Sequence, residues 1–260
     1  MNSSSSASNA PGARLISAGS NAPEIPWGAL DLLTEESYGL KKWRSITVNG
    51  RFVRSYVFIG PRAGRIPIRL ALLGGIDPSD QLSTGAIVKL LIGLDLASLL
   101  AEDFALFVYP AANPPSVACE ALDFLDASWQ EGSDSIASYF ERELTENQFD
   151  GIITVKSGEP IDGFQIQVSS RVIATEVLWP GLEMVERSIP LAQDPIQVVP
   201  RLQEACKSVL GLTSVRPGPF SLLIRTPQGS AAENQISAIV FSIEHILRTY
   251  RKLVRQADSL

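Results

Sequence analysis

The chain has 260 residues, of which 45% are hydrophobic and 19% charged, and its net charge is −6. This length and apolar content suit one domain with a substantial core. The acidic balance leaves no broad basic surface for nucleic acid, and no apolar run approaches the ~18 residues needed to cross a membrane. Two cysteines, Cys119 and Cys206, are too few for a disulfide framework. We therefore expect a cytoplasmic protein with reduced thiols and without nucleic-acid or membrane partners.

The N-terminal segment is rich in Ser, Asn and Ala. It has neither the basic region nor the apolar region of a secretory signal, and it cannot bury enough apolar surface to offset the cost of ordering. We predict a disordered polar tail over residues 1–25 and a single α/β domain over residues 26–260. Trp27 and Leu32 are expected to dock the segment after the tail onto this domain.

Short apolar runs bounded by Gly, Pro or Asn predict strands, and apolar stripes of helical period predict helices. The expected strands cover residues 45–50, 54–60, 70–73, 104–109, 152–155, 171–179 and 220–227. The expected helices cover residues 133–147, 196–210 and 234–254, with a further helix beginning near Pro78. Asn49-Gly50 is expected to form the turn between the first two strands.

The most informative stretch is the turn between the apolar run Leu70–Leu73 and the helix that follows it. The run ends in Gly74-Gly75, which is typical of a buried strand that closes in a tight turn. Open α/β sheets carry their sites at this place, the carboxyl end of a strand. The turn contains two carboxylates, Asp77 and Asp80, and Asp80 also suits the first turn of a helix because of the helix dipole.

This turn resembles the first metal-binding motif of the zinc carboxypeptidase family, including its succinylglutamate desuccinylase and aspartoacylase branch. In that motif an apolar strand precedes Gly-x-His-x-x-Glu. Gly75 matches, whereas Asp77 stands at the histidine position and Asp80 at the glutamate position. Pro110, Asn113 and Pro114 match the Pro-x-x-Asn-Pro sequence that ends the family's next strand. The resemblance implies a three-layer α/β/α sandwich with a mixed, largely parallel sheet.

The other functional positions of the family are also replaced. Asp126 and Ala127 stand where the family has the Asn-Arg pair that holds the substrate carboxylate. Lys156 stands at the third zinc ligand, a histidine, before a matching Ser157-Gly158, and Arg225 stands at the catalytic glutamate. The resemblance thus implies a pocket without zinc, without another cofactor and without catalytic residues. Its candidate residues are Asp77, Asp80, Asn113, Asp126, Ala127, Lys156 and Arg225.

Ligand chemistry leads to the same expectation without the resemblance. A catalytic zinc site uses three protein ligands that usually include histidine, and the chain has one histidine, His245. Two alternatives stay open: a zinc site formed by both cysteines and His245, and a Mg²⁺ or Ca²⁺ site formed by the three candidate aspartates. No motif spacing supports the first, and the lysine and arginine of the candidate pocket oppose the second.

The mixed signs of the candidate residues suggest how charge is balanced in such a pocket. We predict that Lys156 lies within ion-pair distance of Asp77 or Asp80, and that Arg225 lines the same pocket, because carboxylates that have lost a metal need another cation. Four unrelated surface charges are the alternative. Lys156 and Ser157 are adjacent on a strand, so their side chains point to opposite faces and form no catalytic dyad unless the strand ends between them.

Three functions are compatible with these observations. The first is a metal-free relative of the zinc carboxypeptidases that acts as a binding or regulatory module for an unknown small molecule, peptide or protein. The second is a hydrolase of amide or peptide bonds with an altered site, and the third is a structural subunit of an assembly. Fold class does not choose among them, and the sequence predicts no oligomeric state.

Overall fold

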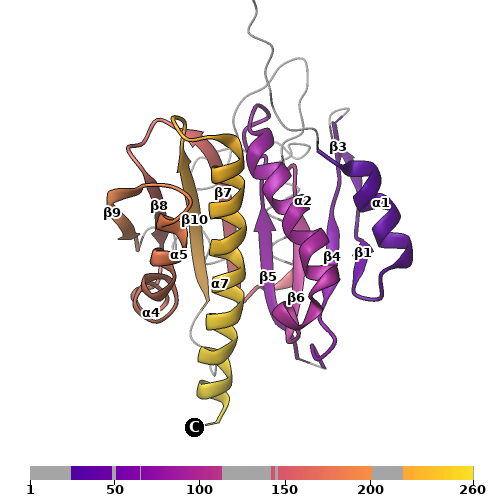
Figure 1. Cartoon of the computed structure of the whole chain (residues 1–260). Helices are drawn as coiled ribbons and strands as arrows, with labels where there is room; N and C mark the ends of the chain where they lie inside the picture. The colour runs from indigo at the N-terminus through magenta and orange to yellow at the C-terminus, as the bar shows by residue number, and fades with distance from the viewer. Residues whose placement is uncertain are drawn as a thin grey trace, which may run out of the picture.

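The computed structural model describes residues 25–48, 51–64, 66–112, 142–143, 146–200 and 219–259. An eight-stranded sheet crosses this part of the chain in the order β1-β4-β6-β5-β7-β10-β8-β9 (Figure 1). Its strands are β1 (Leu40–Lys42), β4 (Tyr56–Ile59), β5 (Ile68–Leu73), β6 (Phe104–Tyr109), β7 (Gly151–Glu159), β8 (Phe164–Val168), β9 (Leu191–Val198) and β10 (Phe220–Pro227). The short strands β2 (Ile46–Val48) and β3 (Arg51–Val53) pair separately.

The centre of the sheet is parallel and its sides are mixed. β6, β5, β7 and β10 all run in one direction, so their carboxyl ends meet at one edge. β4 joins β6, β1 joins β4, and β8 joins β10 in antiparallel pairs. The predicted fold class, α/β with a mixed and largely parallel sheet, is confirmed.

Helices α2 (Gln81–Leu96) and α7 (Ala232–Asp258) lie side by side across one face of the sheet, as Figure 1 shows. α1 (Trp27–Glu36) covers the region near β1, and a series of short turns covers β8 and β9. These turns are α4 (Arg171–Ile173), the π-turn η2 (Ala174–Leu178), the 3₁₀ turn η3 (Trp179–Gly181) and α5 (Leu182–Glu186). A further 3₁₀ turn, η1 (Ser98–Ala101), follows α2.

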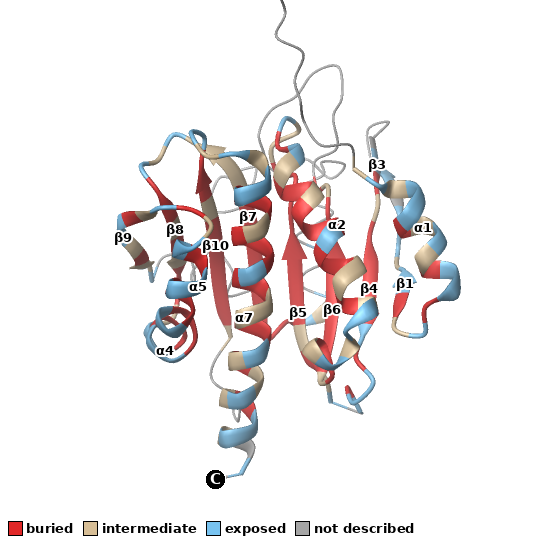
Figure 2. Cartoon of the chain, in the orientation of Figure 1, coloured by how far each residue is buried: buried red, intermediate tan, exposed pale blue. Residues whose placement is uncertain are grey.

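The core lies on both faces of the central strands (Figure 2). Leu70 and Leu72 of β5 pack into the cluster beneath α2 and α7, whereas Ala71 and Leu73 pack into a second cluster on the opposite face. This double burial explains why Leu70–Leu73 of β5 is an unbroken apolar run instead of an alternating one. The closing helix, predicted over residues 234–254, is confirmed as α7, with Ile236, Ile239, Ile243, Leu247 and Tyr250 buried.

Two predictions of secondary structure are wrong. The range 171–179, predicted as a strand, consists of helical turns, because its buried residues Ile173, Ala174, Val177 and Leu178 recur at helical spacing despite their β-branched neighbours. The range 196–210 was predicted as a helix, but its first residues, Ile196–Val198, end strand β9. The remainder of that range from residue 201 lies outside the described residues, as does most of the helix predicted over 133–147.

The first predicted hairpin also differs from the observed one. Residues 46–48 pair with 51–53, and β4 begins later, at Tyr56, to join the main sheet. The predicted docking of the segment after the tail is half correct. Trp27 packs against the core, but Leu32 is 65% exposed, and Leu30 is the apolar residue that α1 buries.

Candidate functional site

The loop from β5 to α2 is held against the end of β6. Gly75 has φ +54°, and a Cβ there would lie 2.5 Å from Thr84 Oγ1 and 2.9 Å from the Cα of Ala111. Its N–H donates to Ser83 Oγ (2.8 Å). Only glycine fits both this conformation and this close approach. The loop therefore presents Asp77 and Asp80 at the carboxyl edge of the sheet, as predicted.

Asp80 connects two elements of the sheet edge. It is the N-cap of α2, where its Oδ1 accepts from the N–H of Ser83 (3.0 Å). Its Oδ2 accepts from the N–H of Ser157 on β7 (2.9 Å), and Ser157 Oγ donates to Oδ1. The residue is only 9% exposed, and burial raises the pKa of its carboxyl although the bonds from Ser157 and Ser83 oppose the shift. Asp80 thus fastens the start of α2 to the end of β7.

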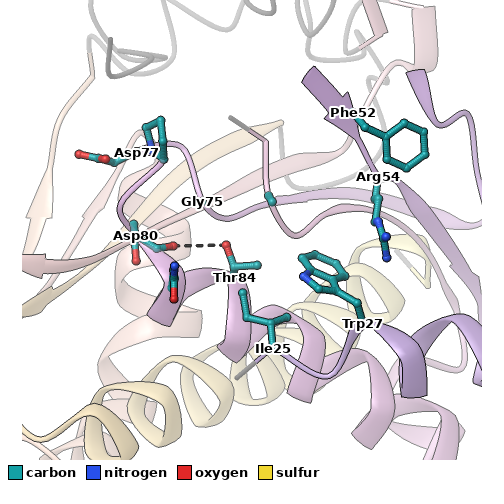
Figure 3. Close-up of a pocket in the computed structure, with 11 residues that line it drawn as sticks. Ile25, Trp27, Phe52, Arg54, Gly75, Asp77, Asp80 and Thr84 are labelled. Atoms are coloured by element: carbon teal, nitrogen blue, oxygen red, sulfur yellow. Dashed lines mark hydrogen bonds between the residues drawn. The ribbon is translucent and has the colours of Figure 1, made fainter. Parts of the chain in front are cut away.

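Within the described residues, the carboxylate of Asp77 makes only local hydrogen bonds. Its Oδ1 accepts from the N–H of Ser79 (2.8 Å) and from Ser79 Oγ (2.7 Å). These bonds lower the pKa of Asp77, and the charge of Lys156 adds a smaller effect in the same direction. In Figure 3 the carboxylate of Asp77 points away from the ring of Trp27.

The two cations predicted to neutralise these aspartates have other surroundings. Lys156 forms no ion pair with either aspartate in the described part of the chain, so that prediction is wrong, although its charge reaches Asp77. Arg225 is the register partner of Lys156 across β7 and β10, but its Nη2 pairs with Glu159 Oε2 (2.8 Å) and its Nη1 donates to Gln165 (3.1 Å). Arg225 therefore forms a local pair with Glu159, and the four charged residues do not make one cluster.

The remaining candidates divide into those that the structure describes and those that it does not. Asn113, Asp126, Ala127 and both cysteines lie outside the described residues. His245 is a packing residue on α7: its Nε2 lies 2.9 Å from the carbonyl oxygen of Val177. A Cβ on Gly181 would lie 2.5 Å from its ring, so that glycine lets the turn approach α7. Among the described residues, no group of three His, Cys, Asp or Glu side chains is arranged to hold a metal ion.

A pocket of about 270 Å³ opens beside the β5–α2 loop (Figure 3). One wall consists of the loop itself, including Gly75, Asp77 and Asp80, and Thr84 Oγ1 donates to the main-chain oxygen of Asp80 there (3.2 Å). The opposite wall consists of Ile25, Trp27, Phe52 and Arg54, whereas neither Lys156 nor Arg225 lines the pocket. Sequence reasoning missed this second wall, because it comes from α1 and the β3–β4 region, which carry no motif.

Comparison with known proteins finds similarity in structure and not in sequence. No family model matches the sequence, and no curated protein matches it. A protein from Shewanella amazonensis SB2B, assigned as a metallopeptidase, superposes with a TM-score of 0.63 at 15% identity, over 88% of this chain and 92% of its own. A metallo-carboxypeptidase from Burkholderia cenocepacia superposes with a TM-score of 0.63 at 13% identity, over 87% of this chain and 68% of its own.

Thrombin-activatable fibrinolysis inhibitor is a third similar structure, with a TM-score of 0.62 at 10% identity, over 88% of this chain and 73% of its own. The chain has a zinc carboxypeptidase-like fold. At these identities the similarity establishes the fold and not the activity. No helix in the described ranges is long and apolar enough to span a bilayer.

The zinc ion that this fold suggests does not fit the residues present. Lys156, which the sequence resemblance aligns with a ligand position, carries an ammonium group that only donates hydrogen bonds. Both oxygens of Asp80 already accept bonds from Ser157, and one also accepts from Ser83. Of the two candidate carboxylates that the structure describes, Asp77 alone keeps an oxygen that accepts no hydrogen bond from the described residues, and a single carboxylate is not a zinc site.

Proposed function

We propose that the chain is a metal-free relative of the zinc carboxypeptidases that has lost peptidase chemistry and acts as a binding or regulatory module. One observation carries the proposal: the carboxylate at the zinc-glutamate position is nearly buried and is saturated by donors from the chain itself. To ligate a metal, Asp80 would have to give up the bonds that join α2 to β7. A structural contact thus occupies the place where a metal centre would otherwise form.

The other altered positions support the same proposal. The cation at the catalytic-glutamate position, Arg225, cannot act as a general base, because a guanidinium has no accessible neutral form. It is held by Glu159 at 2.8 Å and is only 21% exposed, so it is also not directed at a ligand. A pocket lies beside the β5–α2 loop, and under this proposal it is the part of the site that holds a ligand.

Elemental analysis combined with an activity assay tests the proposal. Protein purified without chelator should contain well under one zinc per chain, and it should not release amino acids from peptides with a free carboxyl end. Stoichiometric zinc that survives dialysis would contradict the loss of the metal. Peptide hydrolysis that persists in EDTA and in the absence of zinc would instead support the alternative, an amide hydrolase with an altered mechanism.

A further inference from the structure

The pocket wall opposite the β5–α2 loop carries an arginine between two aromatic rings. The guanidinium carbon of Arg54 lies 5.0 Å from the ring centroid of Trp27 and 5.9 Å from that of Phe52. Phe52 is 52% exposed, so this wall is open to the pocket. Stacking on aromatic faces holds a guanidinium in one plane and leaves the N–H groups on its edges available for hydrogen bonds.

The ion-paired groups on the wall that carries Arg54 have a positive net charge. Its Nη1 pairs with Asp31 Oδ2 (3.2 Å), but Lys42 Nζ pairs with the other oxygen of the same carboxylate (3.3 Å). Tyr56 also donates to Asp31 (3.3 Å), and burial together with the charge of Asp31 raises the pKa of this phenol to about 12, so it stays protonated. Two cations share one anion, which leaves one formal positive charge. Arg54 uses one of its five N–H groups in this pair.

The rest of the pocket limits what an anion on Arg54 can carry. Ile25 and Trp27 supply an apolar surface, and the volume of about 270 Å³ lies at the low end for small-molecule sites. The far wall contains the carboxylates of Asp77 and Asp80, which disfavour a second negative group.

We propose that this pocket binds a small organic monocarboxylate, with its carboxylate on Arg54 and its apolar part against Trp27 and Ile25. The assignment rests on the proposed function, since it names the ligand class of the same metal-free pocket. The geometry suits it because a planar guanidinium edge matches a carboxylate in two parallel hydrogen bonds. Arg54 would be a binding residue that no family motif contains.

Phenylacetate is a suitable probe, and its binding can be followed through the indole N–H signal of Trp27 in ¹H–¹⁵N spectra. We expect saturable binding with a dissociation constant of about 1 mM, as a small anionic fragment allows. Neutral phenylacetamide should bind at least ~10-fold more weakly, since it lacks the charge. Arg54→Gln should weaken phenylacetate binding by ~10-fold or more, and Arg54→Lys should give an intermediate loss.

Arg187→Gln serves as the matched control, because Arg187 is an exposed arginine paired with Glu183 on α5 and does not line the pocket. It should leave phenylacetate binding unchanged. Equal affinity for the acid and the amide, or no saturation by about 20 mM phenylacetate, would overturn the assignment. All titrations are repeated in EDTA. Binding that disappears with EDTA would show that a metal holds the ligand, and it would refute the proposed function. Binding that persists in EDTA and is unchanged by Arg54→Gln would refute only the assignment of the carboxylate to Arg54.

Discussion

The charged groups on the two walls of the pocket differ in burial and in hydrogen bonding. On the loop wall, the carboxylate of Asp80 is nearly buried and accepts bonds from Ser157 and Ser83. On the opposite wall, Arg54 is partly exposed, shares its only carboxylate partner with Lys42, and keeps most of its N–H groups without a partner in the described chain.

The difference separates stability from binding within one pocket. A buried group that is satisfied internally stabilises the fold and offers nothing to a ligand, because leaving its partners unpaired costs free energy. An exposed group with spare donors contributes little to stability but can bind. Under our proposal, a position that matches a metal-binding motif has become structural, and ligand binding lies on a wall that carries no motif.

The largest effect should come from removing the structural carboxylate. Asp80→Ala deletes the N-cap of α2 and leaves the N–H and hydroxyl of Ser157 without their acceptor. The expected loss is about 2–4 kcal/mol of unfolding free energy, measured by urea denaturation. Asp77→Ala is the control, because its bonds are confined to Ser79, and it should cost no more than about 1 kcal/mol. Equal losses of unfolding free energy from the two variants would contradict the structural role that we assign to Asp80 and not to Asp77.

Ser157→Ala should give the next largest effect. It removes the hydroxyl bond to Asp80 but keeps the main-chain bond, so we expect a loss of about 1–2 kcal/mol. Combined with Asp80→Ala, the two losses should not add, and the coupling should exceed about 0.5 kcal/mol. Strict additivity would mean that the two side chains do not stabilise one another.

The pH dependence of stability tests the burial of Asp80. Burial raises its pKa above the ordinary value of 3.8, so in the window just above that value the folded chain holds a proton that the unfolded chain has released. The contribution of Asp80 is therefore largest at low pH and falls as the pH rises through its raised pKa. Unfolding free energies of the parent and Asp80→Asn, compared from about pH 4 to 7, should show the parent's advantage shrinking with pH. An advantage that grows with pH would mean that hydrogen bonding outweighs burial.

The smallest effect should come from Lys156. Because it forms no ion pair with Asp77 or Asp80, Lys156→Met should change stability by no more than about 0.5 kcal/mol, as an ordinary surface change does. It should also raise the pKa of Asp77, since the charge of Lys156 lowers it. NMR titration of the Asp77 carboxyl measures this shift. A large loss of stability would instead support the charge cluster that the sequence predicted.

Helices and strands could be predicted well from the sequence where a single residue pattern identified the element. The unbroken run of β5, the glycine turn after it and the apolar stripe of α7 each have one structural solution. Residues 171–179 were wrongly predicted as a strand because their β-branched residues favour a strand, whereas their helical spacing favours a helix. Packing against α7 favours the helical turns. Chain order also could not show that β4 leaves the first hairpin to join β6.

The candidate site shows the same limit at the level of side chains. The sequence placed Asp77, Asp80, Lys156 and Arg225 at the ends of β5, β7 and β10, and the structure brings these ends together. The sequence could not show which charged groups pair. The partners, such as Ser157 for Asp80 and Glu159 for Arg225, depend on strand register and side-chain rotamers, and motif spacing predicts neither. The wall with Arg54 had no motif at all, and an arginine near aromatic residues is too common a pattern to mark a site.

Zinc titration of the parent and of a variant that carries the zinc ligands of the carboxypeptidase motif tests the central claim most directly. The variant combines Asp77→His, Asp80→Glu and Lys156→His, which supplies two histidines and a glutamate at the three ligand positions. By calorimetry, the parent should show no saturable zinc binding at about 100 μM, whereas the folded variant should bind one zinc with a dissociation constant of about 1 μM or lower. One zinc bound tightly by the parent, or a folded variant that binds none, would contradict the account of Asp80 as a metal-site position converted into a structural contact.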